Sequence, residues 1–433
     1  MTVHFDQARE RAQVVAEQIC RTGVDVILIR DLVGRLTLVV DGEFPADTAD
    51  RFRSAVGAFV GHTPVVRAGD LFDPGSILES PDLFVHREPV DGAGRLAVLE
   101  RSVVGADWAR LGGAPPGRRT TLYGFKGGVG RSTATMLLAK HVAELGKCVL
   151  VVDLDLESPG VSALLQQLEN SPPHGLVDHL VEAAVNNADD LELVSQSRVV
   201  AGAGNGEVWV APASGRPAPG YDYLAKLNRV YSDLPPDVHG NARRFGDRLD
   251  QAIIACEEEV ARRSRRPDVV LLDSRAGIHD IAAVAITRLS DLSLLFAVDN
   301  PHTWEGYRIL FRQWQRNLPP ESLDKLRRRL RMVASMVPSV DPTEHLERFR
   351  DNAQQCFAET LYDDNTDADD LDSFNFAPQD SEAPHFPLPI LFNSDLVGLD
   401  PALHADWHEQ PLVMASYRNF LLGATELLIG QDF

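Results

Sequence analysis

Short apolar segments alternate with longer helical segments along residues 120–392, and this alternation restricts the fold more than any other feature. Continuous runs of β-forming residues, separated by helices, are typical of strands buried on both faces of a parallel sheet. We therefore predict an α/β fold with a doubly wound, mainly parallel sheet, whose ligands bind at the carboxyl ends of its strands. The predicted strands are TTLYGF (120–125), CVLVVDLD (148–155), EVWVAP (207–212), DVVLLDS (268–274), LSLLFAVD (292–299), RMVASMV (331–337) and PILF (389–392).

The chain before this alternation predicts a small α+β domain. Its helices and strands are FDQARERAQVVAEQICRTG (5–23, helix), VDVILIRD (24–31, strand), RLTLVVDG (35–42, strand) and ADTADRFRSAVGAFVG (46–61, helix). A Gly/Pro cluster, RLGGAPPGRR (110–119), then interrupts both helix and strand. We predict an α+β domain of unknown role over 1–110, a linker over 111–119 and the α/β domain over 120–433.

The formal net charge of −21 argues against a protein that binds nucleic acid through its overall charge. A local basic patch stays open, because arginines cluster in ARRSRRP (261–267) and KLRRRLR (325–331). We interpret both clusters as solvated helix ends before buried strands, since cations favour helix C-termini.

Cysteines and hydropathy indicate the compartment. The 4 cysteines are far apart and form no C-x-x-C pair, which fits a reducing compartment and no iron–sulfur or other metal site of that type. The first residues lack an apolar signal core, and no run of about 18 apolar residues occurs. We predict a cytoplasmic protein without a membrane segment, and we interpret RNFLLGATELLIG (418–430) as a packed helix.

Residues 340–388 interrupt the strand–helix alternation, and we interpret them as an acidic, mobile insert in the α/β domain. The stretch DDNTDADDLDS (363–373) has the aspartate spacing of a calcium loop. However, Ala368 and Phe374 stand where such a loop needs glycine and glutamate, so calcium is not favoured.

The stretch YGFKGGVGRST (123–133) has the pattern of a phosphate-binding loop, G-x-x-x-x-G-K-[ST], with Arg131 in the lysine position. It follows a predicted strand and opens the helix STATMLLAKHVAELG (132–146), so backbone N–H groups and the helix N-terminus both face a phosphate. Ser132 is placed to bind Mg²⁺. The residues predicted to bind the nucleotide phosphates here are Gly127, Gly128, Val129, Gly130, Arg131, Ser132 and Thr133.

KGGVGRST resembles the deviant Walker A motif, K-G-G-x-G-K-[ST], of the ParA/MinD family of ATPases. VVDLDLESPG (151–160) resembles the family's switch I, and LLDSRAGIHD (271–280) resembles its switch II. LLFAVDNPHTWEGYRIL (294–310) is similar to the next strand and its Pro-containing loop. Three ordered motifs at the carboxyl ends of strands make the resemblance specific, and it implies a P-loop NTPase fold that binds ATP and Mg²⁺.

The resemblance also implies roles for single residues. Lys126 matches the signature lysine, which reaches the partner's phosphates in an ATP-bound homodimer. Asp155 matches the residue that positions the attacking water, and Asp273 the one that orients Mg²⁺ through water. Gly277 would give a backbone N–H to the γ-phosphate. Asp153 is an alternative to Asp155 as the residue that positions the water, and it is a possible metal ligand.

Other interpretations of these carboxylates and three departures from the family pattern stay open. Asp153 and Asp273 would also fit as helix caps. Arg131 replaces the lysine, which predicts that the chain belongs to a KGGVGR-type subset of ParA/MinD-like proteins. Because arginine is not equivalent to lysine, the motif supports nucleotide binding more strongly than hydrolysis. Arg275 replaces the usual switch II proline and fits either a γ-phosphate contact or an ordinary salt bridge. VASMVPSV (333–340) lacks the family's adenine-reading asparagine, so ATP rather than GTP rests on the resemblance alone.

Two functional hypotheses follow. The first is a dimerisation switch that binds ATP, is expected to hydrolyse it, and cycles a partner protein or complex. The second is an ATP-binding regulatory or scaffold module with little turnover, in a bacterial partitioning, defence or signalling assembly. In both, residues 1–110 are expected to recognise a partner protein. DNA binding stays open but is not favoured by the net charge.

Overall fold

The structure is a computed structural model that describes residues 2–80, 82–87, 92–101, 106–109, 118–199, 204–235, 243–363, 373–396 and 406–430. The chain divides into two compact units, Met1–Ala106 (the N-terminal unit) and Asp107–Phe433 (the C-terminal unit). Trp108 belongs to the second of these, because its ring packs 6.1 Å from that of Trp314. Of the predicted linker, only Arg118 and Arg119 lie among the described residues.

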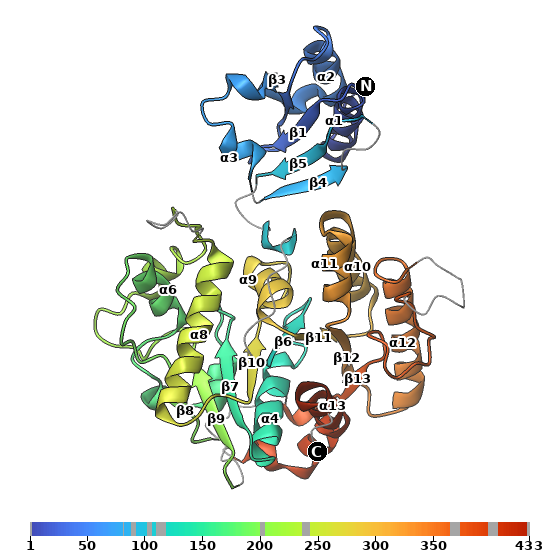
Figure 1. Cartoon of the computed structure of the whole chain (residues 1–433). Coiled ribbons are helices and arrows are strands. Elements are labelled where there is room, and N and C mark those ends of the chain that lie inside the picture. Colours follow the sequence, from blue (N-terminus) through green and yellow to red (C-terminus); the bar gives the residue numbers. More distant parts are fainter. Residues whose placement is uncertain are drawn as a thin grey trace. The chain divides into compact units, whose positions relative to one another are not determined.

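The N-terminal unit is a small α+β fold around a five-stranded mixed sheet of order β3-β2-β1-β5-β4 (Figure 1). One face carries α1 and α2, and alternate strand residues such as Val26 and Leu28 point into that core. The predicted helices and first two strands are present, whereas β3, β4 and β5 were not predicted. The elements are α1 (Phe5–Cys20), β1 (Asp25–Arg30), β2 (Leu36–Asp41), α2 (Thr48–Val56), β3 (Val60–Arg67), α3 (Gly75–Leu78), β4 (Leu83–Arg87) and β5 (Leu96–Glu100).

The C-terminal unit is built on an eight-stranded sheet of order β13-β12-β11-β6-β10-β7-β9-β8. Neighbouring strands run parallel except β8, which is antiparallel to β9. The predicted α/β fold with a doubly wound, mainly parallel sheet is confirmed, and each predicted strand is present. The strands are β6 (Arg119–Gly124), β7 (Cys148–Asp153), β8 (Ser195–Gln196), β9 (Glu207–Ala211), β10 (Val269–Asp273), β11 (Leu292–Ala297), β12 (Leu330–Val337) and β13 (Leu388–Leu391).

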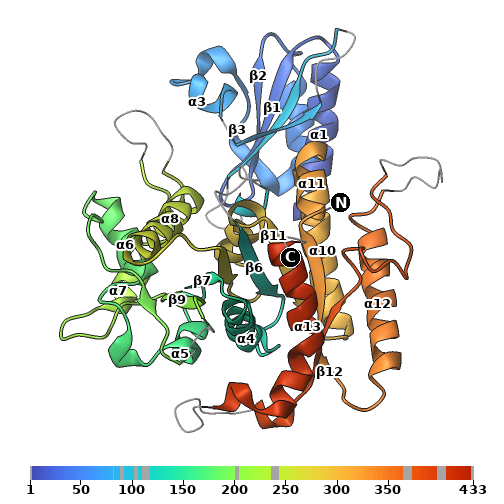
Figure 2. The same cartoon turned by 60° about the horizontal axis from the view of Figure 1, so that its bottom comes forward.

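Helices cover both faces of this sheet. On one face α4 and α13 lie side by side (Figures 1 and 2), where strand residues such as Val149 and Val151 meet them. On the other face α6, α8 and α9 form one core and α10, α11 and α12 another. The helices are α4 (Arg131–Glu144), α5 (Val161–Leu165), α6 (Leu176–Ala184), α7 (Tyr223–Leu227), α8 (Phe245–Arg263), α9 (Asp280–Val284), α10 (Pro301–Asn317), α11 (Pro320–Arg327), α12 (Pro342–Ala358) and α13 (Pro411–Ile429).

The segment 340–388 is more regular than we predicted. Helix α12 occupies its first part and packs against α10 and β12, so the interpretation as an acidic, mobile insert is wrong there. Asp363 accepts hydrogen bonds from the Phe374 backbone and from Arg327. The rest of the calcium-like stretch, 364–372, lies outside the described residues.

The arginines around the end of α11 are only partly solvated. Arg328 is exposed, as predicted, with 54% of its side chain accessible. The prediction is wrong for Arg327 and Arg331, which are buried. Arg331 donates hydrogen bonds to the backbone carbonyls of Ser381, Glu382 and Ala383, because a buried guanidinium needs acceptors for its N–H groups. This cluster therefore fixes a returning loop to β12.

Arg119, the first residue of β6, is a fully buried cation that joins the sheet to α8. Its Nε donates to Glu257 at 2.7 Å and its Nη1 to Asp250 at 2.6 Å. Glu257 is itself buried, so it depends on Arg119 for its counter-charge. Removing one partner of a buried pair costs more than the pair contributes, because the other charge stays behind unpaired.

Arg119→Met is therefore expected to lower the free energy of unfolding of the C-terminal unit by about 3 to 5 kcal/mol. Urea denaturation followed by tryptophan fluorescence measures this unit alone, because all 5 tryptophans follow Ala106. Adding Glu257→Leu should recover much of the loss, and the exposed control Arg328→Ala should change little. Equal effects of Arg119→Met and the control would contradict the assignment.

Candidate functional site

The predicted phosphate loop connects β6 to α4 and has the backbone that its glycines allow. Gly128 and Gly130 have φ angles of 73° and 77°, which residues with a side chain rarely adopt. A Cβ atom placed on Gly127 or Gly128 would meet nothing within 4 Å, so the outer side of the loop is open. A ligand phosphate can therefore approach the backbone N–H groups and the N-terminus of α4.

The inner side of the loop is held from two directions. The ring of Phe125 packs so closely on Gly306 of α10 that a Cβ there would lie 2.2 Å from it. Ser335 of β12 donates a hydrogen bond of 2.7 Å to the carbonyl of Val129. Lys126, between these anchors, is exposed and has no ion-pair partner among the described residues. The loop is thus fixed at its base and presents a free cation.

Asp273, the last residue of β10, connects the sheet to the first turn of α4. It is fully buried. Its Oδ1 accepts hydrogen bonds from Arg131 Nε at 3.0 Å and Thr135 Oγ1 at 3.1 Å, and its Oδ2 accepts one from Ser132 Oγ at 2.7 Å. Ser132 and Asp273 were predicted for the metal site, whereas Thr135 was not predicted.

The oxygen atoms of Ser132 and Asp273 fit Mg²⁺, which prefers hard oxygen ligands and few protein side chains. In the part of the chain that the structure describes, no group of three or more His, Cys, Asp or Glu side chains is placed to hold a metal ion. A divalent ion here would therefore need phosphate oxygens or water in addition to the protein.

Asp153 ends β7 and lies directly beside Asp273 in the register of the two strands. Its oxygens accept hydrogen bonds from the backbones of Asp155 and Gly160 and from both the N–H and the hydroxyl of Ser162. Burial, together with the charge of Asp273, raises the pKa of Asp153 to about 7. These contacts fit the helix-cap interpretation of Asp153, and its roles in water or metal binding stay predictions.

Asp155 lies on the loop after β7 and faces the same space as Arg131. Its Oδ2 is 3.6 Å from Arg131 Nη2. Burial raises the pKa of Asp155, and the charges of Arg131 and Arg275 oppose that rise. Its Oδ1 is buried and has no hydrogen-bond partner among the described residues. Because a buried carboxylate oxygen normally accepts a hydrogen bond, this atom is prepared to accept one from a ligand or from water.

Gly277 adopts the left-handed backbone, with φ 82°, on the loop after β10. Its N–H, predicted to reach the γ-phosphate, donates instead to the carbonyl of Gly124 at 3.2 Å. The Tyr123 hydroxyl donates to the carbonyl of Gly277. This loop therefore rests on the end of β6, and the N–H must exchange its partner before it can bind a phosphate.

Glu157, to which sequence reasoning assigned no role, joins the loops after β7 and β10. It forms an ion pair with Arg275 Nη1 and lies 3.5 Å from His279 Nε2. It also accepts a hydrogen bond from the Tyr231 hydroxyl. Arg275 thus forms the salt bridge that was one of its two predicted roles. The opposite charges of Glu157 and Arg275 on two loops expected to meet were the signal that could have predicted this contact.

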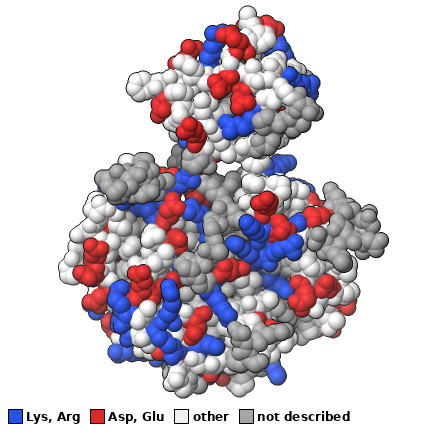
Figure 3. Space-filling model, in the orientation of Figure 1, with Lys and Arg blue, Asp and Glu red and all other residues white. Residues whose placement is uncertain are grey.

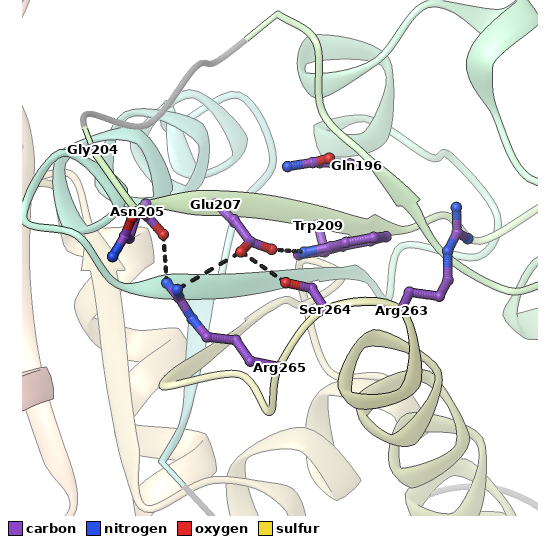
Figure 4. A pocket seen from close by; sticks show the side chains of 9 residues that line it. Gln196, Gly204, Asn205, Glu207, Trp209, Arg263, Ser264 and Arg265 are labelled. Atoms are coloured by element: carbon purple, nitrogen blue, oxygen red, sulfur yellow. Dashed lines mark hydrogen bonds and ion pairs between the residues drawn. The ribbon is translucent and has the colours of Figure 1, made fainter.

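A cavity of about 440 Å³ lies away from the phosphate loop, beside the first residues of β9 and the end of α8 (Figure 4). Its polar side chains bond to one another: Glu207 accepts from Trp209 and Ser264, and Arg265 donates to the Asn205 carbonyl. This cavity contains part of the arginine cluster 261–267. Since these groups already have partners, we assign the cavity no ligand.

Acidic and basic side chains are interspersed on the face drawn in Figure 3. Among the described residues that it colours, no large field of one sign dominates that face. None of the described helices is long and apolar enough to cross a membrane.

Comparison with known proteins agrees with this geometry. Residues 119–216 match the ParA family model, described as NUBPL iron-transfer P-loop NTPase. The chromosome-partitioning ATPase Soj of Thermus thermophilus is 36% identical over 124 residues, which are 28% of this chain and 47% of Soj. Residues 119–216 of the C-terminal unit are thus similar to ParA-family P-loop NTPases.

The match to Soj spans about half of that relative's length. Solved structures similar to this ParA/MinD-like chain include pNOB8 ParA bound to nonspecific DNA, with a TM-score of 0.46, 13% identity and coverage of 73% of this chain and 100% of that one. The MinC:MinD complex of Aquifex aeolicus has a TM-score of 0.39, 16% identity and coverage of 73% and 97%.

Gly306→Ala is expected to push the Phe125 ring off α10 and destabilise the C-terminal unit by about 1 to 3 kcal/mol. Hydrogen exchange of the amides in 125–130 should become faster. Gly127→Ala is the matched control, because a methyl group there has open space. If both variants left urea denaturation and exchange unchanged, the packing of Phe125 would not be what supports the loop.

Proposed function

We propose that this chain binds ATP with Mg²⁺ and hydrolyses it, and that ATP closes a homodimer which acts on a partner protein or complex. The observation that carries the proposal is the buried, unpartnered Oδ1 of Asp155. It lies beside Arg131, whose guanidinium also contacts the Asp273–Ser132 pair. A carboxylate in that position suits the orientation of a water molecule next to a terminal phosphate.

In this reaction the water oxygen forms a bond to the γ-phosphorus and the bond to the β,γ-bridging oxygen breaks. The bond's electron pair stays on ADP, and the water proton leaves with phosphate or solvent. Asp155 accepts a hydrogen bond from the water and so fixes its direction of attack. The loop N–H groups and Arg131 neutralise the charge on the β- and γ-oxygens. Mg²⁺, held by Ser132 and through water by Asp273, would supply further positive charge.

Arg131 gives the site a property that a lysine would not give. Its Nε bonds to Asp273 while its Nη2 faces Asp155, so one side chain contacts both carboxylates. A lysine has one nitrogen and cannot present such a planar fork. Binding of a phosphate has to compete with these two contacts. This favours the second candidate, an ATP-binding regulatory or scaffold module with slow turnover.

Lys126 supports the dimer. A free, exposed cation at the open side of a phosphate loop suits a phosphate supplied by a second copy. The partner is expected to bind the N-terminal unit, in the cytoplasm. By likeness to Soj, chromosome partitioning is one candidate process, beside defence and signalling. The net charge of −21 does not favour DNA as the partner.

Asp155→Ala is expected to keep the affinity for ATP, lower hydrolysis by about 100-fold or more, and leave the ATP-bound dimer intact, because only the orientation of water is lost. Equilibrium dialysis and phosphate release measure the two effects. Asp50→Ala in the N-terminal unit is the control, since its side chain is 84% exposed. Unchanged turnover in Asp155→Ala would refute the role of Asp155, and wild-type binding without any release would favour the regulatory module.

Lys126→Ala is expected to bind ATP as a monomer but to lose the ATP-dependent dimer. Light scattering with ATP–Mg²⁺, with ADP and without nucleotide gives the mass in each state. Lys325→Ala removes another exposed lysine, on α11, and should dimerise normally. A dimer that persists in Lys126→Ala would exclude a contact across the interface.

A further inference from the structure

Arg275 is a cation of the candidate site that the proposed reaction has not used. It follows the end of β10 and its side chain is 32% exposed. Only Nη1 pairs with Glu157, and the other guanidinium nitrogens have no partner among the described residues. Its charge also reaches Asp155, where it opposes the rise of that carboxyl's pKa. Glu157, the ion-pair partner of Arg275, is two residues after Asp155, and the strands before both loops end side by side at Asp153 and Asp273. Arg275 is therefore near the residue proposed to face the γ-phosphate.

Glu157 keeps contacts at one of its two oxygens when it releases Arg275. One of its oxygens accepts from the Tyr231 hydroxyl and lies 3.5 Å from His279 Nε2. The other oxygen faces Arg275, and the Glu157 side chain is 24% exposed. Tyr231 and His279 would keep Glu157 oriented after Arg275 has left. The Glu157 Oε2 atom that faces Arg275 is itself buried, so it needs water or another donor once Arg275 has left.

A triphosphate offers Arg275 a better partner than Glu157 does. Phosphate oxygens accept two parallel hydrogen bonds from a guanidinium, and such charge-assisted pairs are stronger than a single partly solvated contact. A diphosphate lacks the γ-group that would lie beside Asp155. The partner of Arg275 should therefore depend on whether the bound nucleotide carries a γ-phosphate.

We propose that Arg275 leaves Glu157 and contacts the γ-phosphate of ATP bound to its own chain, as a catalytic residue that also distinguishes ATP from ADP. The inference rests on the proposed function and adds to it a residue supplied in cis. During hydrolysis Arg275 neutralises charge on the γ-oxygens while the bond to ADP breaks. With ADP, Glu157 holds Arg275 and thereby holds together the loops after β7 and β10.

The test measures the dissociation constants of ADP and of a non-hydrolysable ATP analogue for the full chain, with Mg²⁺ and with EDTA, together with phosphate release. Arg275→Ala should leave ADP affinity unchanged, weaken the ATP analogue about tenfold or more and slow hydrolysis by about 100-fold. Arg275→Lys should recover part of the analogue's affinity. Glu157→Gln should strengthen the analogue relative to ADP, because it frees Arg275. Arg308→Ala is the control, since it removes another partly exposed ion pair, with Glu359.

An unchanged preference for the ATP analogue in Arg275→Ala would overturn the inference, as would an equal loss of both nucleotides, which indicates a structural role. If Glu157→Gln lowered the preference for the ATP analogue over ADP, Glu157 would not be the residue that holds Arg275. Failure of the wild-type chain to bind either nucleotide would instead refute the proposed function on which the inference rests.

Discussion

The arrangement of the site depends on the buried carboxylate of Asp273. It lies at the end of a central strand without access to solvent, where an ionised group needs a counter-charge and hydrogen-bond donors. Arg131, Ser132 and Thr135 supply them from the first turn of α4. Because these donors come from one helical turn, satisfying Asp273 also fixes the helix that follows the phosphate loop. The geometry of the candidate site and the local stability therefore share the same contacts.

The groups that the proposed reaction requires are already engaged within the chain. Arg131 bonds to Asp273, the Gly277 N–H bonds to the Gly124 carbonyl, and Arg275 pairs with Glu157. Each of these acceptors is an oxygen atom, and a phosphate oxygen could replace it. Nucleotide binding is then an exchange of acceptors, which keeps the cations and N–H groups oriented without ligand. In the proposed function such an exchange would also move the loops after β7 and β10, as a switch requires.

The sequence predicted the parts of the fold that rest on local pattern. Strands of the C-terminal unit, apart from the two-residue β8, which was not predicted, are continuous apolar runs, so their positions could be read directly. The phosphate loop followed from glycine spacing. Strands β3, β4 and β5 were missed, because the apolar side chains of β3 and β4 are only partly buried and their place in the sheet is set by pairing with distant residues. Helix α12 was missed because the acidic stretch after it dominated the interpretation of the whole segment.

The residues of the candidate site also divide into those that a local motif predicts and those that only the fold brings together. Side chains that lie within one motif, such as Ser132 and Arg131, were placed by the motif itself. Thr135 and Glu157 depend on contacts between segments far apart in the chain, 138 residues for Thr135 and Asp273. The opposite charges of Glu157 and Arg275 were visible in the sequence, but their ion pair could be predicted only once the two loops were known to be adjacent.

The measurement that tests this account most directly is amide hydrogen exchange of the loops 154–160 and 274–280 with ATP–Mg²⁺ and with ADP–Mg²⁺. Exchange of acceptors at Arg275 and Gly277 predicts that ATP changes protection in both loops, while ADP changes it mainly in the phosphate loop 125–130. Identical protection with the two nucleotides, or a response to ATP confined to 125–130, would contradict the claim that the γ-phosphate is read by both loops.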